Sequence, residues 1–265
     1  MKVLSLFDGI SCGMVALERA GLSVEKYDAF EIDKYAVSVS ANNFPDIIQH
    51  GDVFNGDFTQ FKGYDLLLGG SPCTYWSVAK VGREITPDGE GFRLFMQYVR
   101  ALEESGCKHF LYENNFSIHR NIKDEISKRL GVQPIMINSA LLSAQQRKRC
   151  YWTNIPNVTQ PEDKRILLMD ILESGMPVNE IDGKSRTIKA QYSRTGSANA
   201  LRGDGFGATM VHDGQAIRKL SPVEAERLQT LPDNYTAGIS NTQRYKCIGN
   251  GWTVDVVAHI LKNMK

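Results

Sequence analysis

Short apolar runs alternate with amphipathic stretches through residues 1–150, and this alternation constrains the fold more than any other feature. Each apolar run has the length of a buried strand, and the stretches between them have the length and periodicity of crossover helices. The pattern predicts an α/β fold in which helices cover a parallel sheet. Strands are expected at 2–7, 26–31, 47–49, 64–69, 108–113, 133–138 and near 149–154, and helices at 12–20, 34–43, 91–105 and 119–130.

The periodicity weakens between residues 155 and 216, where Pro, Asn, Gly, Ser and Thr are frequent. We expect this stretch to be a small insertion, with residues 1–154 and 217–265 forming one main domain. Regular structure is expected to return with a helix over 221–230, because Ser221 suits the cap and Pro222 the first helical position. A last helix is expected over 253–264.

Composition limits the cellular locations and the binding partners that we expect for this protein. The 265 residues contain no apolar run near the length of a membrane span and no secretory leader pattern, so neither is expected. The five cysteines are widely spaced without a CxxC pair, which argues against a disulfide framework or a metal site and favours a reducing cytoplasm. With a net charge of +1, any surface for nucleic acid would have to be a local patch.

The sequence Gly69-Gly70-Ser71-Pro72-Cys73 directly follows the apolar run that ends at Leu68. Two glycines and a proline form a tight turn there, at the edge of the sheet where α/β proteins bind ligands. A cysteine aimed by a rigid turn can act as a nucleophile. The alternative is a small apolar residue in an ordinary turn.

Three neighbouring strands are also followed by residues that suit a ligand. The glycines of Phe7–Gly13 allow a ligand to approach the backbone, although this turn is not a full GxGxxG pattern. Glu31 and Asp52 follow the next two strands, where such folds bind ribose hydroxyls and where an acid could meet an adenine amino group. Either acid could instead cap a helix, but together these strand ends favour an adenosine ligand.

Further charged residues follow the later strands. Glu113 ends the strand after Cys73, where a carboxylate could donate a proton or anchor the amidine-like edge of a base. Alternation along the strand that begins near Gln145 puts Arg147 and Arg149 on the face toward the site and Lys148 on the opposite face. The alternatives are a solvated loop acid and a solvated basic run.

A basic run lies inside the expected insertion. Residues 184–202 carry five basic and no acidic side chains, interleaved with Ser, Thr, Gln and Tyr, and the last of the five is Arg202. Such a run suits contacts with phosphates and base edges, and a solvated basic loop is the alternative.

Taken in order, these motifs resemble those of the DNA (cytosine-5) methyltransferase family, and the resemblance covers essentially the whole chain. The matching residues are Phe7-Asp8-Gly9, Glu31, Asp52, Gly70-Ser71-Pro72-Cys73, Glu113-Asn114, Gln145-x-Arg147-x-Arg149, the stretch from Arg218 to Gln229, and Gly249-Asn250. The resemblance implies a Rossmann-like sheet that binds S-adenosylmethionine, with a small target-recognition insertion at 155–216.

The resemblance also implies roles for individual residues. Cys73 would attack C6 of a cytosine flipped out of duplex DNA, Glu113 would hold N3 and the exocyclic amine, Arg149 would contact O2, and Arg147 would support Glu113 and the site. S-adenosylmethionine would contact Phe7, Asp8, Gly9, Ile10, Glu31, Ile32, Asp52, Val53, Gly70, Pro72, Leu94, Asn250, Gly251 and Trp252. DNA would contact Ser77, Arg83, Lys184, Arg186, Thr187, Lys189 and Arg194. The segment Thr74–Gly91 resembles the family's mobile loop, which closes over the flipped base.

The chain departs from the usual pattern of this family at Asn115, Cys12 and Trp252, where relatives mostly carry valine, glycine and a small residue. Other readings stay open: methylation of cytosine in RNA, a catalytically silent DNA-binding relative, and a dinucleotide oxidoreductase. The favoured expectation is a monomeric, cytoplasmic enzyme acting on double-stranded DNA, for which a cognate restriction nuclease is a candidate partner.

Overall fold

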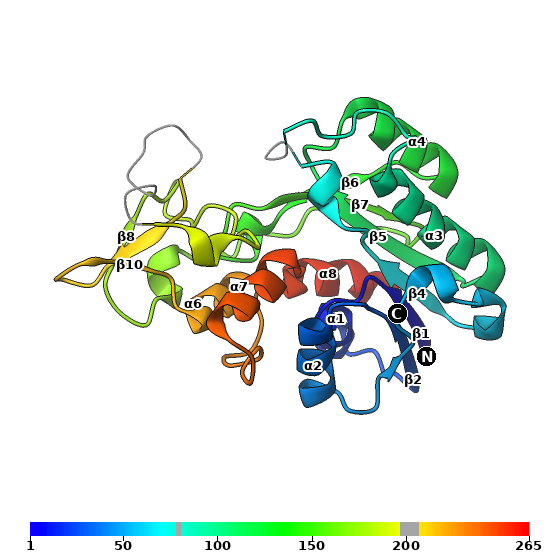
Figure 1. The fold of residues 1–265 in the computed structure, drawn as a ribbon, viewed down its shortest axis with the longest axis horizontal. Helices are drawn as coiled ribbons and strands as arrows, with labels where there is room; N and C mark the ends of the chain where they lie inside the picture. Colours follow the sequence, from blue (N-terminus) through cyan, green and yellow to red (C-terminus); the bar gives the residue numbers. More distant parts are fainter. Residues whose placement is uncertain (78–80, 197–206, 265) are drawn as a thin grey trace.

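The computed structural model describes residues 1–77, 81–196 and 207–264, and its main feature is a seven-stranded sheet in the order β3-β2-β1-β4-β5-β7-β6 (Figure 1). The strands are β1 (Lys2–Leu6), β2 (Lys26–Phe30), β3 (Ile48–Gln49), β4 (Leu66–Gly69), β5 (His109–Asn115), β6 (Ile135–Asn138) and β7 (Lys148–Thr153). All seven expected strands are confirmed. The expected parallel sheet is mostly confirmed, and it departs from this pattern at β7, which runs antiparallel to both β5 and β6.

Helices cover both faces of this sheet, because alternate strand residues point to opposite sides. Val3 packs on the side of α1 (Cys12–Ala20) and α8 (Val254–Leu261), whereas its neighbour Leu4 packs on the side of α3 (Glu90–Ser105) and α4 (Arg120–Leu130). Helix α2 (Lys34–Asn43) lies on the α1 side. The α/β fold class is therefore confirmed, with mainly aliphatic side chains filling the layer on the α1 side and many aromatic ones the layer on the α3 side.

A second sheet lies at the end of the molecule away from β1 and β2 (Figure 1). It consists of the antiparallel strands β8 (Met176–Val178), β9 (Met210–His212) and β10 (Ile217–Lys219). Strands of three residues are too short to show alternation, so the sequence analysis missed them. Because β10 belongs to the small sheet, the small region extends to Lys219, beyond the boundary expected at residue 216. Arg202 of the basic run and residues 78–80 of the expected mobile loop lie outside the described residues.

Helices α6 (Pro222–Leu228) and α7 (Asn241–Asn250) connect the two sheets, and their Leu228 and Ile248 share an apolar cluster with Tyr192 of the small region. Helix α6 has the expected cap, since the Ser221 side chain accepts a hydrogen bond from the Glu224 N–H. Helix α7 was not expected, because its sequence is mostly polar. The short 3-10 turns are Val53–Asn55, Phe58–Phe61, Cys73–Tyr75, Ser139–Leu141, Leu168–Ile171, Tyr192–Arg194 and Lys262–Met264.

None of the helices in the described part of the chain is long and apolar enough to cross a membrane.

Candidate active site

The turn after β4 is held in place by buried polar side chains of β5. The Asn114 side-chain amide donates to the Ser71 carbonyl at 3.0 Å, and the Ser71 and Tyr112 hydroxyls share a hydrogen bond of 2.6 Å. Gly70 fits because a Cβ at this position would lie 2.9 Å from the Glu113 carbonyl oxygen. These contacts fix the turn that presents Cys73.

Cys73 differs from the other four cysteines in its surroundings. It is half-buried at the start of a 3-10 turn, whereas Cys12, Cys107, Cys150 and Cys247 are buried. Burial raises the pKa of Cys12 and Cys247 to about 12 and that of Cys150 to about 11. These buried thiols therefore stay protonated near neutral pH, and Cys73 is the thiol that a substrate can reach.

The Glu113 carboxylate is held on both of its oxygens. Arg149 Nε lies 2.9 Å from Oε1, and the Trp252 indole N–H donates to Oε2 at 3.1 Å. The arginine that forms the ion pair with this carboxylate is Arg149, whereas Arg147, expected to support Glu113 and the site, holds the neighbouring wall of the cavity. Since Arg149 comes from the antiparallel strand β7, next to β5, it reaches the end of β5 directly.

Arg147 is 4% exposed, and the partners of its side chain are backbone carbonyls. Its guanidinium donates to the carbonyls of Ile188, Gly249 and Gly251 at 2.9 to 3.2 Å. Burial and the nearby Arg149 lower the pKa of Arg147 from its ordinary value. Arg147 thus joins the small region and the segment after α7 to the strand that carries Arg149.

A cavity of about 730 Å³ lies beside Cys73 and is lined by all four expected catalytic residues and all fourteen expected cofactor residues. Its walls come from the carboxyl ends of β1, β2, β4 and β5, from helix α3 through Leu94, and from the segment after α7. Parallel strands that end at one edge bring these side chains together, as the sequence predicted.

The acids of this cavity have distinct partners. The Glu31 carboxylate accepts hydrogen bonds from the backbone N–H groups of Gly9, Ile32 and Asp33, each at 2.8 Å. The Asp8 carboxylate accepts from the hydroxyls of Ser5, Ser11 and Tyr27 at 2.5 to 2.7 Å, and burial raises its pKa. Asp8 thereby shapes the first turn, while Glu31 keeps unused lone pairs for a ligand.

Two further acids near the cavity cap helical segments. Asp52 accepts from the Phe54 N–H, so it does cap a 3-10 turn while also lining the cavity. Asp33 caps α2, accepts from the Lys246 side chain of α7, and lines the cavity; the sequence analysis did not propose it. Its position two residues after Glu31, ahead of a helix, was the available signal.

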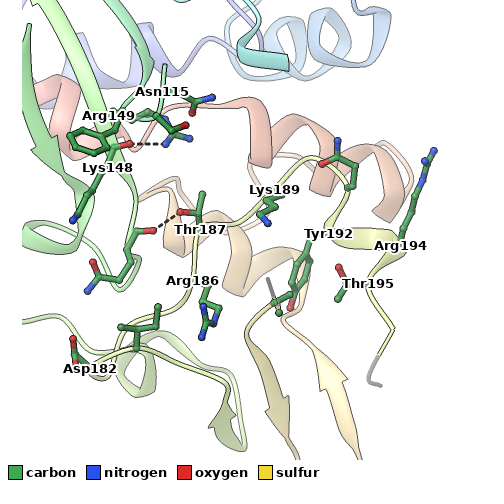
Figure 2. Close-up of a pocket in the computed structure, with 17 residues that line it drawn as sticks. Asn115, Lys148, Arg149, Asp182, Arg186, Thr187, Lys189, Tyr192, Arg194 and Thr195 are labelled. Carbon is green, nitrogen blue, oxygen red and sulfur yellow. Dashed lines mark hydrogen bonds between the residues drawn. The ribbon is translucent and has the colours of Figure 1, made fainter. Parts of the chain in front are cut away.

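A second cavity of about 970 Å³ begins at Arg149, which lines both cavities, and extends to the small region (Figure 2). Its basic lining residues are Lys148, Arg149, Arg186, Lys189 and Arg194, and its acidic one is Asp182. Phe116 also lines it, is 41% exposed, and lies within 6 Å of the Lys123 and Lys148 ammonium groups. Lys148 was expected on the face away from the site, but it lines this cavity together with Arg149. Phe116 was not among the residues predicted from the sequence.

The seven residues expected to contact DNA lie in different parts of the structure. Arg186, Thr187, Lys189 and Arg194 line the larger cavity, while Ser77 and Arg83 belong to the segment after Cys73. Arg83 donates to the Ser117 carbonyl at 2.8 Å.

The expectation that Lys184 contacts DNA is corrected by its burial. Lys184 is 7% exposed, and its ammonium group donates to the carbonyls of Ala140, Ser143 and Ile166. These bonds satisfy all three donors, so the side chain ties the small region to the main sheet.

Known proteins with similar sequences identify the family of this chain. The family model for C-5 cytosine-specific DNA methylase matches residues 1–166 and 117–265, which together span the chain. The chain belongs to this family. It is 29% identical to the type II methyltransferase M1.ScrFI of Lactococcus lactis subsp. cremoris, covering 99% of this chain and 77% of that protein. The M.NlaX enzyme of Neisseria lactamica is 28% identical, over 100% and 96% of the two chains.

Among solved structures, the Entamoeba histolytica methyltransferase EhMeth has a TM-score of 0.78 at 16% identity, covering 100% of this chain and 99% of that one. This likeness shows that the fold is shared. As a C-5 cytosine methylase, the protein uses S-adenosylmethionine as its methyl donor.

The smaller cavity fits this cofactor. Its volume of about 730 Å³ is in the range of nucleotide-sized ligand sites. Glu31 and Asp52 offer carboxylate oxygens to hydroxyl and amino groups, and Ile32, 77% exposed, offers an apolar surface at the rim. Gly9 has a φ of +60° with open space where a Cβ would point, so the ligand can approach the backbone.

Proposed function

We propose that this protein methylates C5 of a flipped-out cytosine in duplex DNA through a covalent bond between Cys73 and C6. One observation carries the proposal: the half-buried Cys73 and the Glu113–Arg149 pair line the same cavity as the expected cofactor residues. Arg149 also lines the neighbouring basic cavity. Extrusion of the base follows from the chemistry, since C5 and C6 cannot be attacked from both faces within the stack.

Each residue has a defined task in this mechanism. The Cys73 thiolate adds to C6, while Glu113 holds N3 and the exocyclic amine and supplies the proton that neutralises the ring. Arg149 contacts O2 and orients Glu113. Bound S-adenosylmethionine supplies an electrophilic methyl group to the enamine-like C5. Loss of the C5 proton and elimination of Cys73 then restore the aromatic ring.

The larger cavity is the proposed DNA-binding surface. Five basic lining residues against one acidic residue give a local positive potential although the net charge of the chain is only +1. We assign target recognition to the small region between residue 155 and the end of β10, whose Arg186 and Lys189 face this cavity (Figure 2). Lysine and arginine beside an exposed aromatic ring suit phosphates and bases.

The biological setting is part of the same proposal. Two relatives are called type II methyltransferases, which supports a restriction–modification role with a cognate nuclease for this chain. We propose that the enzyme acts as a monomer in the cytoplasm. The five widely spaced cysteines without a CxxC pair support a reducing compartment.

The proposal is tested by trapping the enzyme on plasmid-derived duplex DNA that contains 5-fluorocytosine, with S-adenosylmethionine present. Fluorine cannot leave C5 as a cation, so the enzyme should stall as a denaturant-resistant covalent complex, and Cys73→Ala should form none. Sequencing of the trapped DNA would identify the target site. A tRNA that traps while DNA does not would replace the DNA proposal by RNA methylation, and failure of both acceptors despite cofactor binding would overturn the proposed chemistry.

A further inference from the structure

Trp252 lies between the Glu113 carboxylate and the first turn of the cofactor site. Its indole N–H donates to Glu113 Oε2 at 3.1 Å. Its side chain also packs against the apolar cluster that includes Cys12 and Val15 of α1, and a Cβ added at Gly13 would lie 3.7 Å from Trp252 Cζ3. One side chain therefore contacts both the residue that would hold the base and the helix that begins at the cofactor loop.

The backbone around Trp252 is fixed by buried side chains. The Gly251 carbonyl accepts hydrogen bonds from Arg147 at 2.9 Å and from Gln229 at 3.1 Å. On the other side, the Thr253 hydroxyl donates to Gln229 at 2.8 Å, and Thr253 is 1% exposed. With its backbone anchored on both sides and its ring packed, the indole N–H has a defined direction.

The Glu113 carboxylate needs such an anchor. Arg149 Nε, from β7, holds only Oε1 of this carboxylate. Trp252 holds the other oxygen from a separate element. Two donors on opposite oxygens set the rotation of the carboxylate plane, which decides whether Glu113 can face N3 and the exocyclic amine together.

We propose that Trp252 is a positioning residue that orients Glu113 and ties this orientation to the wall of the cofactor site. The inference rests on the proposed function of the same site. It gives a role to the residue at which this chain departs from the small side chain usual in its family. Trp252 acts through Glu113, so its loss should slow methyl transfer more than it weakens binding.

The test compares Trp252→Phe with Trp152→Phe. Both changes keep an aromatic ring and delete one indole N–H; Trp152 is fully buried and donates to the Ser127 hydroxyl at 2.9 Å in the core beside α4. Single-turnover methyl transfer from labelled S-adenosylmethionine is measured on plasmid DNA and on tRNA. Dissociation constants for S-adenosylhomocysteine and DNA, and the melting temperature, are measured on the same preparations.

We expect Trp252→Phe to slow transfer about 10-fold or more, as for a lost hydrogen bond to a charged group, with both dissociation constants changed less than about threefold. Trp152→Phe should keep the wild-type rate. In a Glu113→Gln background, adding Trp252→Phe should change the residual rate less than about twofold, because the shared step is already lost.

An unchanged rate in Trp252→Phe, or a loss explained by weaker cofactor binding, would overturn the inference. So would a full Trp252→Phe effect in the Glu113→Gln background, since Trp252 would then act independently of Glu113. A wild type that methylates neither DNA nor tRNA would instead overturn the proposed function, and this inference with it.

Discussion

Arg147 directly precedes β7 and Arg149 lies within it, and their partners give these two arginines different roles. Arg147 is buried among backbone carbonyls, while Arg149 pairs with Glu113. Side-chain alternation could place both toward the site but could not distinguish them, because the partners come from β5 and from the segment after α7. Burial likewise distinguishes Cys73 from the other cysteines.

We predict that Cys73 is the thiol that reacts first with iodoacetamide in the folded protein. The other four are buried, and burial holds the pKa of Cys12 and Cys247 near 12, so they lack both access and thiolate. Mass spectrometry of peptides after limited alkylation at pH 8 should show label at Cys73, and the protein denatured in urea should show label at all five. Equal early labelling of Cys12 would contradict this reading of the site.

At the scale of elements, the C-terminal helix completes a site that the N-terminal half begins. Helix α8 packs against α1 through buried side chains that include Val257 and Ile260. The end of α7, at Asn250, and the segment before α8, with Gly251 and Trp252, line the cofactor cavity. The packing of α8 therefore stabilises the fold and also positions one wall of the site.

We predict that Ile260→Ala lowers the free energy of unfolding by about 2–5 kcal/mol, the range for a large side chain removed from a packed core. Ile260 is 0% exposed, whereas Ile48 of the edge strand β3 is 43% exposed and serves as the matched control. Urea denaturation should show a change of about 1 kcal/mol or less for Ile48→Ala. Binding of S-adenosylhomocysteine should weaken in Ile260→Ala only; equal behaviour of the two variants would show that α8 does not support the site.

At the scale of the whole molecule, positive and negative side chains are nearly equal in number but are distributed unevenly. The chain has a net charge of +1, but basic side chains gather on the cavity that runs from Arg149 to the small region (Figure 2). Lys184 does not belong to this surface, since its ammonium group is buried on three carbonyls. Two lysines from one basic run thus have different surroundings: Lys184 is buried on carbonyls, whereas Lys189 lines the cavity that we propose for DNA.

We predict that Lys189→Ala reduces the slope of log affinity for DNA against log salt by about 0.9, the value for one lost phosphate contact. Lys184→Met should leave that slope unchanged and lower the free energy of unfolding by about 1–3 kcal/mol, because buried carbonyls lose their donor. Fluorescence anisotropy with a labelled duplex between 50 and 200 mM KCl, together with urea denaturation, separates the two effects. A reduced slope in Lys184→Met would return this residue to the DNA-binding surface.

The sequence by itself determined the α/β class, the strands of the main sheet and the edge at which the site lies. The first physical reason is that strand and helix periodicities are local features of the sequence. The second is that parallel strands present their carboxyl ends at one edge of the sheet, where Cys73 follows β4 and Glu113 lies near the end of β5. Only the tertiary structure decided the antiparallel direction of β7, the short strands of the small sheet, the burial of Lys184 and the contact of Trp252 with Glu113. These depend on partners far away in the chain, and no local pattern records which distant group a side chain will meet.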